Sequence, residues 1–68
     1  MKLSARNVLP GRIIAVTKGA TTAHIKLELV PGLTMISSIT NKAVDDLDLK
    51  VGGSAWAVIK SSDVMIGK

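Results

Sequence analysis

Two short polar clusters at opposite ends of this 68-residue chain hold the side chains best suited to bind a ligand. The first is Ser4-Ala5-Arg6-Asn7, and the second is Lys60-Ser61-Ser62. They offer hydroxyl, guanidinium, amide and ammonium donors, and the backbone N–H groups of Ala5 and Ser61 can add to them. Because a fully deprotonated dianion accepts hydrogen bonds at every oxygen and donates none, this set of donors suits such an anion.

The choice of anion follows from the shortage of acceptors. Monohydrogen phosphate fits poorly, since its proton needs an acceptor and the only acidic residue beside either cluster is Asp63. Tetrahedral dianions such as molybdate, tungstate and sulfate fit better. In a regular strand Lys60 and Ser61 would point to opposite faces, so one of them must act through a bulge or its backbone. Residue chemistry alone leaves open whether the clusters form one site or two separate solvated surfaces.

Few residues of this chain suit catalysis, since it has one histidine and no cysteine. A serine nucleophile needs a base, but His24 alternates with Lys26 and Glu28 on a strand face that reads as solvated. The three aspartates within residues 45–48 lack the ligand spacing of a calcium loop. We therefore expect no enzyme activity, no organic cofactor and no site for a bare metal cation.

The net charge of +4 favours an anionic partner, and the first 44 residues hold six Lys or Arg side chains against one Glu. Proteins that bind single-stranded nucleic acid rely on aromatic platforms for stacking. Trp56 is the only aromatic residue, and its aliphatic neighbours indicate a core or subunit-interface position. The basic side chains are also scattered singly. A small barrel that binds single-stranded nucleic acid is therefore the alternative to an oxyanion-binding protein.

Length and composition indicate one small domain over residues 1–68 with an aliphatic core. The chain is 47% apolar but has neither Phe nor Tyr. Such a short chain cannot bury that much aliphatic surface within itself and has no disulfide, so we expect a homo-oligomer. No apolar run approaches the roughly 18–20 residues that span a membrane, and no apolar signal core follows Lys2. The expected location is the cytoplasm, without a membrane partner.

Alternation and turn residues predict a mostly β chain. The clearest alternation, over 22–29, sets apolar residues at odd positions against His, Lys and Glu at even positions from 24 onward. Residues 33–40 change phase, which a bulge or burial on both faces would explain. Pro10-Gly11 suggests a bend or bulge within one long first strand. The expected strands are 12–17 with this extension, 22–29, 33–40, and 54–59, which is continued by 60–62 and then 64–66.

One short helix is expected between the third strand and the last, with Asn41 as its cap. Ala43, Val44 and Leu47 would face inward, and the two aspartates after Val44 would lie near the positive end of the helix. Several short strands with one helix outline an all-β fold, a small five-stranded barrel of the oligonucleotide/oligosaccharide-binding (OB) kind. A small SH3-like barrel is the competing fold.

The order of these motifs resembles the molbindin (Mop) family of TOBE-type domains. The most specific pair is the opening Ser4-Ala5-Arg6-Asn7 with Gly11 and the closing Ala57-Val58-Ile59-Lys60-Ser61-Ser62-Asp63-Val64. Between them lie Gly19 before an alternating strand, Ser38-Ile39-Thr40, and Leu47 and Leu49 before Gly52. The resemblance covers essentially the whole chain.

This resemblance implies an OB-like barrel whose subunits exchange strands and assemble as a hexamer, with oxyanions at the subunit contacts. It implies a cytoplasmic protein that binds molybdate or tungstate. A free-standing copy, without a DNA-binding or nucleotide-hydrolysing domain, would store, buffer or deliver the oxyanion in molybdenum homeostasis.

The resemblance also implies roles for individual residues. Those expected to contact the oxyanion are Ser4, Ala5, Arg6, Lys60 and Ser61. Thr40 would complete this site from a neighbouring subunit. A second class of oxyanion site, near the symmetry axis, would involve the turn Gly19-Ala20-Thr21-Thr22 or His24. Ala43 stands where relatives often carry serine, and affinity would differ if that hydroxyl matters.

Overall fold

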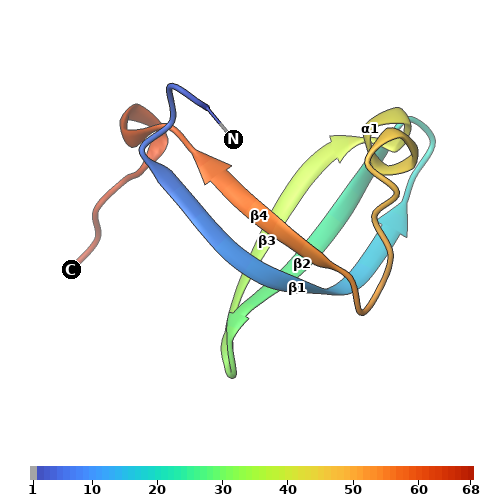
Figure 1. Cartoon of the computed structure of the whole chain (residues 1–68), viewed down its shortest axis with the longest axis horizontal. Helices are drawn as coiled ribbons and strands as arrows, with labels where there is room; N and C mark the ends of the chain where they lie inside the picture. The colour runs from blue at the N-terminus through green and yellow to red at the C-terminus, as the bar shows by residue number, and fades with distance from the viewer. Residues whose placement is uncertain (1) are drawn as a thin grey trace.

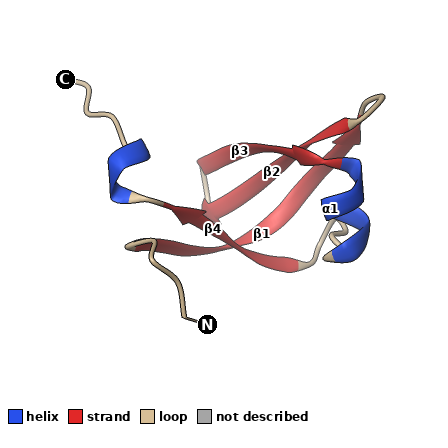
Figure 2. Cartoon of the chain, turned by 90° about the horizontal axis from the view of Figure 1, so that it is seen from above, coloured by secondary structure: helices blue, strands red, loops and turns tan. Residues whose placement is uncertain are grey.

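The computed structural model describes residues 2–68 as one antiparallel sheet with a short helix at one end (Figure 1). The sheet order is β3-β2-β1-β4, with β1 at Asn7–Lys18, β2 at Thr22–Val30, β3 at Leu33–Thr40 and β4 at Ser54–Ile59. Helix α1 spans Asn41–Asp46, and a 3-10 turn, η1, spans Ser61–Asp63 after β4. Figure 2 places α1 and η1 at opposite ends of the sheet. The fold is small, curled and mostly β.

β1 joins two parts of the sheet because it bends near its middle. Its first half pairs with β4 and its second half with β2. A Cβ on Gly11 would stand 3.1 Å from the carbonyl oxygen of Glu28, so glycine lets the strands approach closely at the bend. The register with β2 then shifts between Ile13 and Ala15, as at a bulge. The predicted single long first strand that runs through Pro10-Gly11 is confirmed.

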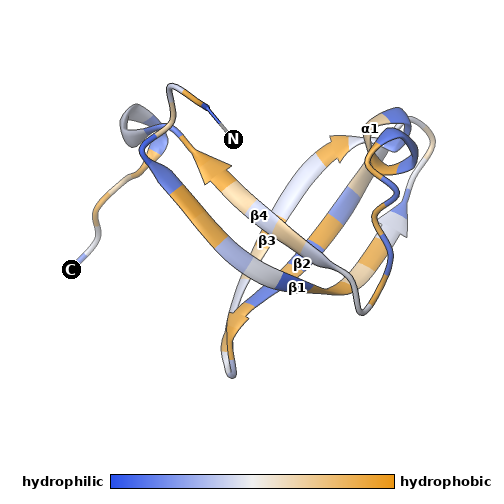
Figure 3. Ribbon diagram, in the orientation of Figure 1, coloured by the Kyte–Doolittle hydropathy of each residue, from blue (hydrophilic) through white to orange (hydrophobic). Residues whose placement is uncertain are grey.

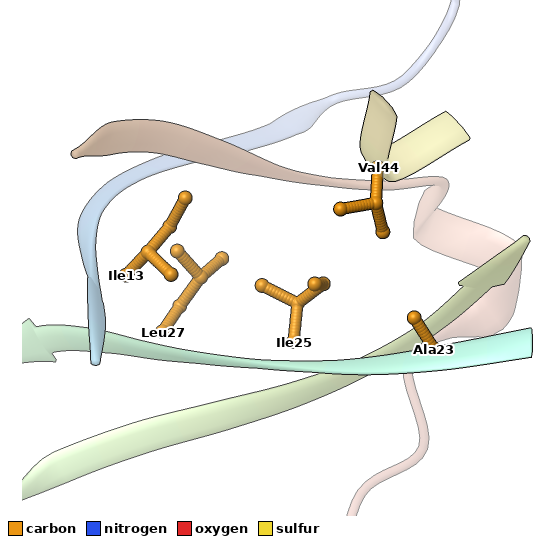
Figure 4. Close-up of a cluster of buried hydrophobic side chains, with 5 residues drawn as sticks. All are labelled: Ile13, Ala23, Ile25, Leu27 and Val44. Atoms are coloured by element: carbon orange, nitrogen blue, oxygen red, sulfur yellow. The ribbon is translucent and has the colours of Figure 1, made fainter. Parts of the chain in front are cut away.

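The core fills the inside of the curled sheet and is entirely aliphatic (Figure 4). Its buried members are Ile13, Ala23, Ile25, Leu27 and Val44. Three of them are the alternate inward positions of β2, which confirms the alternation predicted over 22–29. Figure 3 shows that apolar residues also follow the first half of β1 and the end of β4. Many of these are exposed, so one chain buries only part of its aliphatic surface.

The change of phase in β3 leaves an apolar side chain exposed. Met35 and Ile39 pair with core residues of β2, whereas Ile36 is 68% exposed. The register shift in the β2–β3 pairing lies beside the hairpin, between the pairs Glu28–Thr34 and Val30–Leu33, and its extra residue is on β2. The predicted bulge in the third strand is therefore wrong, as is burial of both its faces within this chain.

α1 begins at Asn41, but its cap is Thr40, whose Oγ1 accepts a hydrogen bond from the N–H of Ala43 (3.1 Å). The prediction of Asn41 as the cap is wrong by one residue. Val44 is buried as predicted, whereas Leu47 is 66% exposed at the end of the helix.

The aspartates of α1 lie in its second half, so the prediction that they complement its positive end is wrong. Instead, Nζ of Lys18 lies 2.6 Å from Oδ1 of Asp45, and Nζ of Lys42 lies 2.7 Å from Oδ2 of Asp46. Exposed pairs of this kind stabilise a protein by at most about 1 kcal/mol. These pairs matter more for the local charge than for stability, because each aspartate compensates the positive charge of its lysine.

The described chain contains four strands rather than the five expected. After η1, residues 64–68 lie outside regular secondary structure, with Met65 92% and Ile66 91% exposed. β3 and β4 form the two edges of the sheet. Neither helical segment within residues 2–68 is long and apolar enough to cross a membrane.

Candidate anion-binding site

The two polar clusters from the ends of the chain meet at one end of the sheet. β1 begins at Asn7, β4 ends at Ile59, and these two residues are paired. The chain therefore enters β1 and leaves β4 at the same place, as Figures 1 and 2 show. An open pocket lies there, which we call the terminal pocket, lined by Ser4, Arg6, Lys60, Ser61 and Ser62.

The turn η1 explains how the neighbouring residues Lys60 and Ser61 line the same pocket. In a continued strand their side chains would point to opposite faces. Instead, the Asp63 N–H donates to the Lys60 carbonyl oxygen (2.9 Å), and the Val64 N–H donates to the Ser61 carbonyl oxygen (3.3 Å). A departure from the regular strand was expected here, and it takes the form of a 3-10 turn rather than a bulge.

The terminal pocket is cationic and rich in donors. Arg6 and Lys60 bring two positive charges, three serine hydroxyls lie with them, and no acidic side chain is in the lining. Within residues 2–68 neither cation forms an ion pair, since the recorded pairs use other lysines. The lining residues are exposed, so their donors are open to an anion from solution.

Two residues of the polar clusters differ from the roles that the family resemblance implies. Ala5 is half-buried and lies outside the pocket lining, so contact through its backbone N–H stays a prediction. Ser62 does line the pocket, although the resemblance does not single it out. Its signal in the sequence is its place within the donor cluster at 60–62.

Thr40 is far from the terminal pocket within one chain. It caps α1 and pairs with Thr22 across β2 and β3. Because α1 and η1 are at opposite ends of the sheet, the structure groups Thr40 with the second candidate site and not with the first (Figure 2). Only a neighbouring subunit could bring a Thr40 hydroxyl to the terminal pocket.

The second candidate site is the exposed turn between β1 and β2, whose residues are Gly19, Ala20, Thr21 and Thr22. The Gly19 N–H donates to the Thr22 carbonyl oxygen (2.7 Å), and the side-chain amide of Asn41 donates to the Gly19 carbonyl oxygen (2.9 Å). The hydroxyl oxygens of Thr21 and Thr22 lie 3.4 Å apart. Two hydrogen bonds therefore fix the turn, which offers two hydroxyls.

Charge distinguishes this turn from the terminal pocket. Lys18, which precedes the turn, is paired with Asp45. His24 is exposed, two positions beyond the end of the turn. The buried Oδ1 of Asn41 has no hydrogen-bond partner among the described residues, and as an acceptor it suits a donor rather than an anion. Within one chain the turn thus offers less uncompensated positive charge than the terminal pocket.

An apolar groove of about 490 Å³ lies inside the curled sheet. Its walls include Ile25, Leu27 and Ile39 from the β2–β3 side and Ala57 and Ile59 from β4. No charged residue lines it, so the groove fits apolar side chains rather than an oxyanion. Trp56 also contributes to the groove but is 57% exposed, so its predicted position in the core is wrong and a position at a subunit interface stays a prediction.

Comparison with known proteins identifies the family of this chain. The model of the TOBE domain family matches residues 3–66. Molybdenum-pterin-binding protein 3 of Clostridium pasteurianum is 47% identical over 66 residues, which cover 97% of each chain. This chain belongs to the molbindin (Mop) family of TOBE domains. The family resemblance predicted from the sequence is thus confirmed.

Two solved structures share this molbindin fold. A molybdate-binding protein from Sporomusa ovata superposes with a TM-score of 0.93 at 32% identity, over 100% of both chains. ModG, described as a cytoplasmic molybdate-binding protein and solved with molybdate bound, superposes with a TM-score of 0.90 at 45% identity. That match covers 96% of this molbindin chain and 46% of ModG.

Proposed function

We propose that residues 1–68 form a single molbindin domain that binds molybdate or tungstate at the terminal pocket. The observation that carries the proposal is the meeting of two uncompensated cations and three hydroxyls in one pocket without an acidic side chain. The two similar structures described as molybdate-binding proteins support the same class of ligand. The protein would act as a binding protein and not as an enzyme.

The donors divide the work of binding between charge and geometry. Arg6 and Lys60 supply charge-assisted hydrogen bonds, which are stronger than neutral ones. Ser4, Ser61 and the backbone N–H groups of Ala5 and Ser61 fix the positions of the anion oxygens. Thr40 of a neighbouring subunit completes the site, since the Thr40 of the same chain lies at the other end of the sheet. Molybdate and sulfate present the same acceptors, so cavity size separates them.

The assembly we propose is a strand-exchanged homo-oligomer, a hexamer, whose subunits are five-stranded OB-like barrels. Three features of the single chain support exchange. The β3 and β4 edges are open, the apolar groove between them has no charged lining, and the apolar residues of 64–66 are exposed. Residues 64–66 of one subunit would lie against the groove of another as its fifth strand. The terminal pocket, which adjoins this segment, would then lie at a subunit contact.

The biological role that fits is storage, buffering or delivery of the oxyanion in the cytoplasm. The turn at 19–22, together with His24, would provide a second and weaker class of site in the assembly. Binding of single-stranded nucleic acid draws no support, because Trp56 is the only aromatic residue and the relatives are named for molybdenum or molybdate.

Calorimetric titration of the whole chain with molybdate, tungstate, sulfate and phosphate tests this function. We expect molybdate and tungstate to bind more tightly than sulfate, and phosphate to bind worst because no carboxylate lines the pocket to accept its proton. Equal affinity for all four anions, or no heat with molybdate, would contradict the proposal.

A further inference from the structure

The side chain of Asn7 makes a hydrogen bond at the end of the β1–β4 pairing, next to the terminal pocket. Its Nδ2 donates to the carbonyl oxygen of Ile59 at 3.2 Å, between residues 52 apart in sequence. Among residues 2–68 it is the one side-chain hydrogen bond that joins β1 to β4. Arg6 directly precedes Asn7, and Lys60 directly follows Ile59, so the bond joins the two segments at the point where each leads into a cation of the pocket.

This end of the sheet needs such a bond because it is only a two-stranded ribbon. β2 pairs with the second half of β1 and leaves the first half with β4 alone. Two-stranded ribbons without a covered face are marginally stable and fray from their ends. Val8 and Val58, the next pair along the ladder, are 37% and 45% exposed, so little packing holds the ribbon closed there.

We propose that Asn7 is a positioning residue for the oxyanion site, an inference that rests on the proposed function. By fixing the peptide that leads into Lys60 against the start of β1, its amide holds the Arg6 and Lys60 segments at one separation before the anion arrives. Arg and Lys side chains lose much rotamer freedom when they are ordered. When the β1–β4 ribbon is already paired, anion binding costs only this side-chain freedom. When the ribbon is frayed, binding must also order its backbone.

The test compares Asn7→Val with Asn7→Gln. Valine suits a strand and removes the donor, whereas glutamine keeps an amide that can reach a carbonyl. Titration with molybdate should show Asn7→Val weaker by about three- to tenfold, the range expected for loss of one hydrogen bond. Asn7→Gln should recover part of that loss. The matched control is Ile13→Val, a core substitution outside the pocket that also lowers stability modestly.

Hydrogen exchange in the absence of anion gives the second measurement. In Asn7→Val the amides of residues 57–63 should exchange faster, while those of β2 and β3 keep their rates. Unchanged molybdate affinity in Asn7→Val, or an equal loss in Ile13→Val, would overturn the role of Asn7. If the unsubstituted chain gives no heat with molybdate, the proposed function fails, and unchanged exchange at 57–63 would separately refute closure of the ribbon by Asn7.

Discussion

The two ends of this small sheet hold similar residues but treat charge in opposite ways. At the terminal pocket, Arg6 and Lys60 have no ion-pair partner within residues 2–68. At the turn end, Lys18 and Lys42 are each paired with an aspartate of α1, although hydroxyls are present there too. Both ends therefore offer hydroxyls beside lysines, but the lysines at the turn end are paired. What distinguishes the terminal pocket is positive charge that no neighbouring carboxylate compensates.

The largest expected effect is at the terminal pocket. Lys60→Ala removes a charge-assisted hydrogen bond, worth about 1.5–3 kcal/mol, so molybdate affinity should fall by roughly 10- to 150-fold. The loss is measured by calorimetric titration, with folding checked by circular dichroism. Lys26→Ala, which removes the same charge from an exposed position on β2, should bind molybdate almost as the unsubstituted chain does. An equal loss of molybdate affinity in both variants would show that binding depends on the net charge of the protein and not on the position of Lys60.

An intermediate effect is expected for Thr40→Val, which tests whether the two ends meet across subunits. Loss of the cap to the Ala43 N–H should lower stability by about 0.5–2 kcal/mol. If a neighbouring Thr40 hydroxyl completes the terminal pocket, molybdate affinity falls as well. Thr40→Ser keeps the hydroxyl and should retain both stability and affinity. A Thr40→Val protein that is less stable but binds molybdate normally would exclude Thr40 from the site.

The smallest expected effect is for Asp45→Asn, which makes the turn end more like the terminal pocket. Lys18 loses its partner, and because the pair is exposed the stability should change by less than about 1 kcal/mol. The released charge should strengthen weak molybdate binding at the turn, seen as a tighter second phase in the titration. A second phase that does not tighten would show that pairing of Lys18 is not what weakens the turn.

The parts of the fold that follow local patterns could be read from the sequence. The alternation in β2, the start of β4 and the long first strand across Pro10-Gly11 all follow from side-chain periodicity and turn residues. The predicted continuation of the last strand through 60–62 and 64–66 is wrong, because the chain turns at η1 after Ile59. The exposure of Ile36 and Leu47 could not be read in this way. An apolar residue indicates a buried position only if something covers it, and coverage depends on elements distant in the chain.

The candidate site shows the same division. The donors of the terminal pocket could be chosen from their chemistry, and Ser62 belonged to the same cluster. The distance from Thr40 to that pocket could not be foreseen, because it depends on which end of the sheet carries α1. The ion pair of Lys18 was equally hidden, since its partner Asp45 lies 27 positions away in sequence. Lys42 and Asp46 differ, because they have the i,i+4 spacing of a local helical pair.

The sequence by itself determined which side chains could bind an anion: Ser4-Ala5-Arg6-Asn7 near one end and Lys60-Ser61-Ser62 near the other, with no cysteine and a single histidine, favour an oxyanion as the ligand. Only the tertiary structure decided that the clusters line one pocket and that the lysine beside the turn is paired with an aspartate. The physical reason is the pairing of β1, whose first half lies against β4 and whose second half lies against β2. That pairing joins residues 52 positions apart, and no local pattern encodes such a contact.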